Sequence, residues 1–83
     1  MTSKNELLQN IDKLHTTPMG AERIAENLGL GAQAGDPVLW CRKKIESPDC
    51  DISRKGKNWY CQIDGARITV NAYSYTIITA HRI

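Results

Sequence analysis

Two histidines and one arginine are the residues of this sequence that could carry proton and phosphate chemistry. Cleaving RNA without a metal needs a base for the 2′-hydroxyl, an acid for the 5′-oxygen, and cations that hold the phosphate. A histidine side chain ordinarily changes charge near neutral pH, so either His15 or His81 could give or take a proton. Arg67 can bind a phosphate through two parallel hydrogen bonds, with Lys57 as an added point charge. Together they predict an RNA- or nucleotide-phosphate site, provided that the fold brings them together.

A turn in the second half of the chain sets how Arg67 and its neighbours face. Asp64-Gly65 is a strong signal for a two-residue hairpin between the alternating stretches 57–63 and 66–71. In that register the opposed residues of one side are apolar or small: Ile63 with Ala66, Cys61 with Ile68, and Trp59 with Val70. Those of the other side are polar: Gln62 with Arg67, Tyr60 with Thr69, and Asn58 with Asn71. We therefore expect one buried face and one open, polar face.

The last expected strand, residues 75–82, completes the open face in one of two phases. One phase places Tyr75, Thr79 and His81 there, and the other places Thr76, Ile78 and Arg82 there. We favour the first, because Ile78 and Ala80 then join the core, although Ile77 is left on the polar face. Tyr60 and Tyr75 could stack on a base. The predicted substrate-binding residues are thus Lys57, Tyr60, Thr69, Asn71, Tyr75 and Thr79, and the predicted catalytic ones are His81, His15 and Arg67.

The first half of the chain predicts helices. Residues 6–15 carry apolar side chains at helical spacing, and His15 would stand at the helix end. Thr17-Pro18 combines a capping hydroxyl with a proline suited to the first helical position, and Gly29 ends the second helix. After a flexible loop at 31–35, Asp36-Pro37 repeats the same signal for a third helix that ends near Ser47-Pro48.

These elements predict an α+β fold. Two to three N-terminal helices pack on one face of a four-stranded antiparallel sheet, whose first strand is expected at 50–54. The 83 residues allow a single domain, with a helical part at 1–47 and a sheet part at 48–83, and are too few for the large α/β enzyme folds.

Charge is unevenly distributed along the chain. Net charge is only +2, which excludes a histone-like polycation. Residues 1–41 carry three cations against five carboxylates, however, whereas residues 42–83 carry eight cations against four carboxylates. The basic sheet half is therefore where we expect a phosphate-bearing partner.

Cysteine usage and hydropathy bear on the compartment. The three cysteines lack C-x-x-C spacing, which favours reduced thiols in the core over a disulfide framework and gives only a weak zinc signal. No apolar run approaches the roughly 18 residues that a membrane helix needs, and no apolar targeting segment follows the N-terminus. We expect a cytoplasmic protein with no cofactor and no membrane contact.

Simpler interpretations remain open for each of these residues. A polar face is what any half-solvated antiparallel sheet shows. His15 can be a helix-end charge, His81 can belong to a frayed terminus, and Tyr60 and Tyr75 can be cross-strand packing partners. The alternative function is a non-enzymatic binding module, such as a small bacterial or phage regulator of a protein or nucleotide ligand.

Three segments carry a resemblance that covers nearly the whole chain. They are Asp12-Lys13-Leu14-His15-Thr16-Thr17, Lys55-Gly56-Lys57-Asn58-Trp59-Tyr60, and residues 68–81, which read ITVNAYSYTIITAH. With these segments the chain resembles a family of small uncharacterised bacterial proteins, classed only as a domain of unknown function. That resemblance implies no established activity.

A looser resemblance is to the barnase/colicin/RelE-like ribonuclease superfamily. Its members also place helices before an antiparallel sheet, and their final strand often reads like residues 75–81. The resemblance implies metal-independent RNA cleavage, often by a toxin with an antitoxin partner. By position, only Thr79 and His81 carry over as site residues, with Arg67 and Lys57 as cations. The chain departs from RelE toxins in its low net charge and in lacking a basic helix.

A third resemblance lies in the helical half. Residues 21–30, AERIAENLGL, look like the first half of a DNA-binding helix-turn-helix, but the next helix begins only near Asp36-Pro37, after a loop too long for that motif. The exposed face of that next helix offers Arg42-Lys43-Lys44.

The expected partners are an RNA or nucleotide. A protein partner could be an antitoxin or a host target, and a second copy of the chain could form a homo-oligomer.

Overall fold

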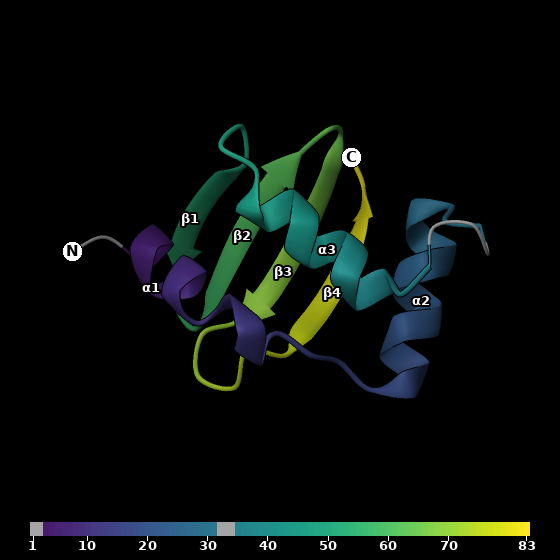
Figure 1. Ribbon diagram of the computed structural model, residues 1–83, viewed down its shortest axis with the longest axis horizontal. Coiled ribbons are helices and arrows are strands. Elements are labelled where there is room, and N and C mark those ends of the chain that lie inside the picture. The colour runs from purple at the N-terminus through teal and green to yellow at the C-terminus, as the bar shows by residue number, and fades with distance from the viewer. Residues whose placement is uncertain (1–2, 32–34) are drawn as a thin grey trace.

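The computed structural model describes residues 3–31 and 35–83 (Figure 1). Its helices are α1 (Ser3–Gln9), α2 (Pro18–Leu28) and α3 (Pro37–Glu46), with a 3₁₀ turn η1 (Ile11–Lys13). Its strands are β1 (Asp51–Lys55), β2 (Asn58–Ile63), β3 (Ala66–Asn71) and β4 (Ile77–Arg82), which pair antiparallel in chain order. The predicted α+β fold, with helices that precede a four-stranded antiparallel sheet and pack against it, is confirmed.

The two proline-led helices begin where the sequence predicts. Thr17 Oγ1 accepts a hydrogen bond from the amide of Gly20 (3.0 Å), and Asp36 Oδ1 accepts one from Val38 (2.8 Å). Each bond satisfies one of the amides that a helix leaves unpaired at its start. Gly29 ends α2 in the left-handed conformation (φ 68°), which glycine adopts without strain. The loop expected at 31–35 lies largely outside the described residues.

The single helix expected over residues 6–15 is wrong. α1 ends at Gln9, the Asn10 side chain donates to the Glu6 carbonyl (2.9 Å), and the chain continues through η1. Leu14 is extended (φ −60°, ψ 129°), so His15 follows an extended residue and is not a helix-end charge. Apolar spacing did not reveal this break, because two short helical turns bury the same side chains that one helix would.

The hairpin between β2 and β3 has the predicted register in all six pairs, from Asn58 with Asn71 to Ile63 with Ala66. Asp64 and Gly65 both have positive φ values (53° and 72°), as the tight type I′ turn requires. The predicted separation into an apolar face and a polar face follows from this register.

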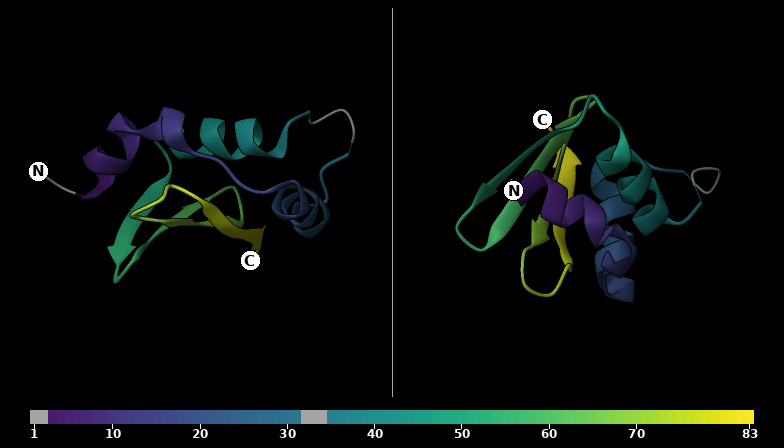
Figure 2. Two further views of the ribbon diagram at one scale, coloured as in Figure 1. Left: turned by 90° about the horizontal axis from the view of Figure 1, so that it is seen from below. Right: turned by 60° about the vertical axis from the view of Figure 1, so that its left-hand side comes forward.

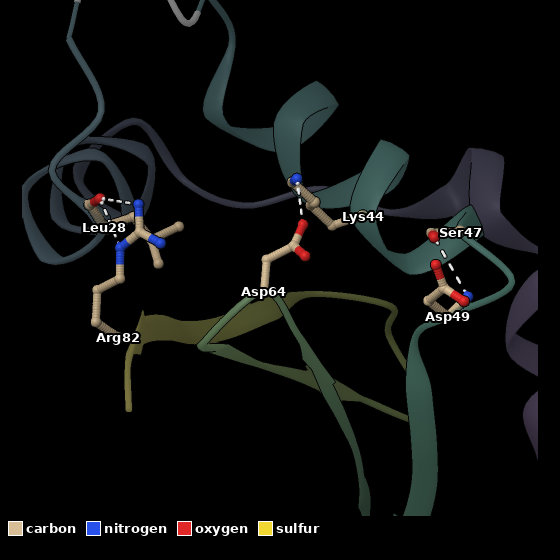
Figure 3. A network of polar contacts seen from close by, with 6 residues as sticks. All are labelled: Leu28, Lys44, Ser47, Asp49, Asp64 and Arg82. Atoms are coloured by element: carbon tan, nitrogen blue, oxygen red, sulfur yellow. Dashed lines mark hydrogen bonds and ion pairs between the residues drawn. The ribbon is translucent and has the colours of Figure 1, made fainter.

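The face of the sheet that the helices cover holds the core. We call it the covered face; its buried sheet residues are Trp59, Cys61, Ile63, Ala66, Ile68, Val70, Ile77 and Ala80. α1 and α3 lie over this face, and α2 lies beside β4 (Figure 2). Two contacts hold the layers together (Figure 3): Arg82 donates twice to the Leu28 carbonyl (3.0 and 3.2 Å), and Lys44 pairs with Asp64 (2.6 Å).

A bulge in β4 overturns part of the predicted phase of that strand. Thr69 faces Thr79 and Val70 faces Ile77, so Ile78 is an extra residue between them. Ile77 is therefore buried on the covered face, whereas Ile78 is 53% exposed, the reverse of the expectation for both. Ala80 is buried as predicted. Among the described residues, no helix has the length and apolar character needed to cross a membrane.

Candidate functional site

The uncovered face of the sheet, which we call the open face, carries most of the predicted site residues. Adjacent strands place them in rows that run across the sheet. The first row is Asp51, Gln62, Arg67 and His81, and the second is Ser53, Tyr60, Thr69 and Thr79. Neighbouring side chains of a row stand about 5 Å apart. Arg67 and His81 are thus direct cross-strand neighbours.

Arg67 is held in place by its other neighbour. With its oxygen turned toward the guanidinium, the Gln62 carboxamide accepts from Nη2 (2.8 Å) and Nε (3.1 Å) of Arg67. Among the described residues Arg67 makes no ion pair, and its Nη1 group has no hydrogen-bond partner. A half-buried guanidinium that is fixed on one edge and unpaired on the other is suited to an anion.

A hollow of about 500 Å³ lies over this part of the open face. It is lined by Ser53, Lys55, Gly56, Tyr60, Gln62 and Arg67. Two of these residues are cations, one is an aromatic ring, and none is a carboxylate. Asp51 lies on the same face, opposite Gln62 on the edge strand. The hollow therefore combines positive charge with a surface on which a flat ring could stack.

The lysine that lines the hollow differs from the one predicted as a substrate-binding residue. Lys57 lies in the turn between β1 and β2, where its carbonyl accepts from Ala72 (2.7 Å), and it does not line the hollow. Lys55 lines it instead, together with Ser53 and Gln62, which were not predicted as site residues. A signal was present: Gly56 (φ 61°) opens a two-residue turn, which fixes the pairing of β1 as firmly as Asp64-Gly65 fixes that of β3.

Tyr75 does not lie on the open face, which corrects the predicted phase at the start of the last strand. It precedes β4 with a left-handed backbone (φ 60°), and its ring packs on the covered face against Trp59, with centroids 5.4 Å apart. Lys13 Nζ lies 5.6 Å from the same ring. Because the bulge at Ile78 shifts the alternation, Tyr75 and His81 face opposite sides of the sheet.

Asn71 lies on the open-face side of β3, but its side chain has a structural role. Its Oδ1 accepts from the amides of Tyr73 (2.9 Å) and Ser74 (2.9 Å) and from the Ser74 hydroxyl (3.1 Å). These bonds build the loop between β3 and β4. Thr69 is also little available, since it is only 6% exposed between Tyr60 and Thr79. Of the two threonines predicted on the open face, Thr79 is the more accessible.

His15 lies at the opposite end of β4 from His81. It forms a parallel bridge there, since its amide donates to the Tyr75 carbonyl (3.2 Å) and its carbonyl accepts from Ile77 (2.8 Å). Its ring nitrogens lie 2.8 Å from the Lys13 carbonyl and 3.2 Å from the Thr76 hydroxyl. The two histidines are separated by the length of β4. At about 3.3 Å per residue, this length is roughly 15 Å. Arg67 and His81 are brought together, and His15 is not.

The three thiols form a group on the covered face, away from the open face. Cys41, Cys50 and Cys61 are all buried. Burial, with the Asp36 carboxylate adding to it, raises the pKa of Cys41 to about 12. A hydrogen bond with Cys50 and burial raise the pKa of Cys61 far above its usual range. Such thiols stay protonated at neutral pH and are poor nucleophiles. The described residues hold no cluster of three or more side chains placed to bind a metal ion.

The basic segment of α3 is largely engaged in the fold. Arg42 pairs with Glu46 (3.5 Å), and Lys44 pairs with Asp64 and lies 5.4 Å from the Trp40 ring. Lys43 is exposed. α2 ends at Leu28 and α3 begins only at Pro37, so these helices lack the short turn of a helix-turn-helix.

One comparison with known proteins gives a match. The family described as "Protein of unknown function (DUF3781)" matches residues 8–81, which is nearly the whole chain. No curated protein and no solved structure matches. The looser resemblance to the barnase/colicin/RelE-like ribonuclease superfamily therefore stays a prediction.

Proposed function

We propose that this chain, which belongs to the DUF3781 family of proteins of unknown function, binds a phosphate-bearing RNA or nucleotide on its open face. The observation that carries the proposal is the hollow that joins Arg67, fixed by Gln62, to the Tyr60 ring and Lys55. His81 borders this group from the neighbouring strand.

Arg67 is the proposed phosphate anchor. An arginine that is already oriented loses little side-chain freedom when it binds, so more of the charge-assisted hydrogen bonding appears as affinity. Its free Nη1 edge and the imidazole of His81 can approach one phosphate from adjacent strands. Lys55 adds a second cation at the other side of the hollow, as an unpaired point charge.

Tyr60 is the proposed stacking surface for a base. It lies in the second row of the open face, between Ser53 and Thr69, and lines the hollow beside Arg67. Base stacking on an aromatic ring tolerates any sequence, because every base has a flat face. Asp51 opposes this attraction from the sheet edge. We therefore propose moderate affinity for single-stranded RNA, with strong salt dependence and little sequence preference.

Binding without cleavage is the form of the proposal that the geometry favours. Metal-independent cleavage uses two proton carriers on opposite sides of the phosphate. The open face has one imidazole, that of His81, while His15 is bound at the far end of β4. The endoribonuclease hypothesis stays a prediction, and the experiment below includes it.

The test is fluorescence anisotropy with a short 5′-labelled single-stranded RNA, in chelator and at low salt. We expect the wild-type chain to bind and Arg67→Gln to weaken binding by at least about tenfold, since a hydrogen bond to a charged group contributes about 1.5–3 kcal/mol. Lys55→Gln should weaken it less and reduce the salt slope by about one. Arg23→Gln is the matched control, because Arg23 is an exposed arginine on α2.

Two outcomes would count against the proposal: no binding at millimolar protein, or equal binding by wild type and Arg67→Gln. Either would favour the alternative, a module for a protein partner. The same RNA is then run on a gel after long incubation in chelator. Cleavage that is lost in His81→Ala would establish the ribonuclease activity, and intact RNA would exclude it.

A further inference from the structure

The two edges of the sheet are treated differently by the rest of the chain. β4 is bordered by α2, and its first residue pairs with His15 through backbone hydrogen bonds. β1 is the outermost strand on the side opposite α2 (Figure 1). Across residues 3–31 and 35–83, no backbone hydrogen bond reaches β1 from outside the sheet. α1 packs against β1, but the outward backbone groups of this strand have no backbone hydrogen-bond partner among the described residues, so they can pair with another strand.

The sequence of β1 is self-complementary when it is paired antiparallel with itself. The strand reads Asp51-Ile52-Ser53-Arg54-Lys55. Pairing centred on Ser53 places Asp51 opposite Lys55 of the second strand, and Lys55 opposite its Asp51. Opposite charges in directly opposed positions stabilise a strand pair. In the described part of the chain, neither Asp51 nor Lys55 makes an ion pair, so both are available for this one.

Geometry selects this register among the alternatives. Two copies that share one continuous sheet must oppose residues that face the same side, so the pairing can be centred on residue 52, 53 or 54 but not between residues. Centring on Ile52 leaves Arg54 and Lys55 outside the strand pair. Centring on Arg54 opposes two arginines, which is unfavourable. Only the register centred on Ser53 uses all five residues and pairs Asp51, the acid of the strand, with Lys55 of the other copy.

We propose that the β1 edge binds the β1 edge of a second copy of this chain, which joins two four-stranded sheets into one eight-stranded sheet. The contact is isologous, so one two-fold axis passes through the Ser53 pair and the assembly closes as a dimer. Because each open face keeps its side of the sheet, the hollow beside β1 in one copy adjoins the hollow of the other. The proposal shares Lys55 with the hollow, where the ion pair with the second copy would lower its charge, but it does not depend on what the open face binds.

The test is the mass in solution, measured by sedimentation equilibrium over a range of concentrations. A contact of one short strand is small, so we expect a concentration-dependent equilibrium between the 9.3 kDa chain and twice that mass. Asp51→Lys and Lys55→Asp each oppose like charges at both ends of the strand pair. Each variant alone should weaken the dimer by at least about tenfold. Both positions are exposed, so the variants should fold, and far-UV circular dichroism checks this.

Mixing the two variants gives the decisive result. Asp51→Lys carries two lysines at these positions and Lys55→Asp carries two aspartates, so the equimolar mixture should form a heterodimer that neither variant forms alone. The matched controls, Glu26→Lys and Arg23→Asp, make similar charge changes on α2 at the other edge and should dimerise like wild type. A wild-type chain that stays monomeric at about 1 mM would overturn the proposal. So would a dimer that both single variants leave unchanged.

Discussion

Two neighbouring residues of β2 show how differently the two faces of the sheet are built. The Trp59 side chain is fully buried on the covered face, with the Tyr75 ring against it. Tyr60, the next residue, is half-buried on the open face and lines the hollow beside Arg67. Strand alternation alone produces this difference, since it sends successive side chains to opposite faces. The covered face should therefore contribute the stability of the fold, and the open face should contribute recognition.

The largest expected effect is that of removing Trp59. Trp59→Ala deletes a fully buried ring and should lower the free energy of unfolding by about 3–5 kcal/mol. Trp59→Phe should cost much less, because it keeps a ring and removes an indole N–H that has no partner among the described residues. Tyr60→Ala on the open face should cost about 1 kcal/mol. Urea denaturation measures all three, and equal losses at residues 59 and 60 would contradict the division between the faces.

The thiols of the covered face predict a loss of stability at high pH. In the unfolded chain a thiol ionises near 9.0, whereas the pKa of Cys41 in the fold is about 12. Above pH 9 the unfolded state therefore binds fewer protons than the native state, and stability falls until pH approaches 12. The slope should be about 1.4 kcal/mol per pH unit for each such thiol. Below pH 9 the contribution of the buried, protonated Cys41 thiol to stability is fully present.

Urea denaturation between pH 8 and pH 10.5 tests this prediction. Cys41→Ala should flatten the decline by about one thiol's contribution, even if it is less stable throughout. An unchanged slope in Cys41→Ala would show that Cys41 ionises in the native state, and that the covered face is wetter there than its burial indicates.

A smaller effect is expected where α2 is fixed to the sheet. Arg82→Met removes both hydrogen bonds to the Leu28 carbonyl and should lower the free energy of unfolding by about 1 kcal/mol. Arg42→Met is the control, since it breaks only an exposed ion pair on α3 and should cost no more than about 0.5 kcal/mol. Hydrogen exchange of α2 amides would locate the change. If Arg82→Met does not speed amide exchange in α2 more than in β2, the contact between Arg82 and Leu28 does not hold the helix.

The smallest effect on stability is expected at the proposed anchor. Arg67→Gln should change the free energy of unfolding by no more than about 0.5 kcal/mol, because Arg67 lies on the solvated face, while it weakens RNA binding by at least about tenfold. Thermal denaturation beside the anisotropy titration compares the two quantities in one variant. A loss of stability as large as that of Arg82→Met would assign Arg67 to the scaffold instead.

Local chemistry explains what the sequence could predict. Thr17-Pro18, Asp36-Pro37 and Asp64-Gly65 each act within four residues, and the structure places two helix starts and one register where they indicate. That register alone was enough to place Arg67 beside Gln62. The hollow and its lining residue Lys55 required the pairing of β1 as well, and the Gly56 turn carries that information.

The failures depend on contacts between distant residues. His15 is extended because its backbone pairs with Tyr75 and Ile77, some sixty residues later, and no local signal encodes that pairing. Tyr75 turns inward because the loop built on Asn71 forces a left-handed backbone there and because Trp59 offers a ring to pack on. In both cases tertiary contacts override the simple alternation of a strand.

The extra residue at Ile78 separates β4 into two segments that are out of step with each other. Strict alternation would put Ile77 and His81 on the same face, so one of them would have to be misplaced. The bulge lets the first segment bury an isoleucine on the covered face while the second keeps its imidazole on the open face. A deletion of residue 78 would remove the bulge, and strict alternation from Ile77 to Thr79 would then keep Ile77 and His81 on opposite faces without it. Leaving one residue unpaired, rather than changing any side chain, thus keeps His81 next to Arg67 in a strand that also contributes to the core.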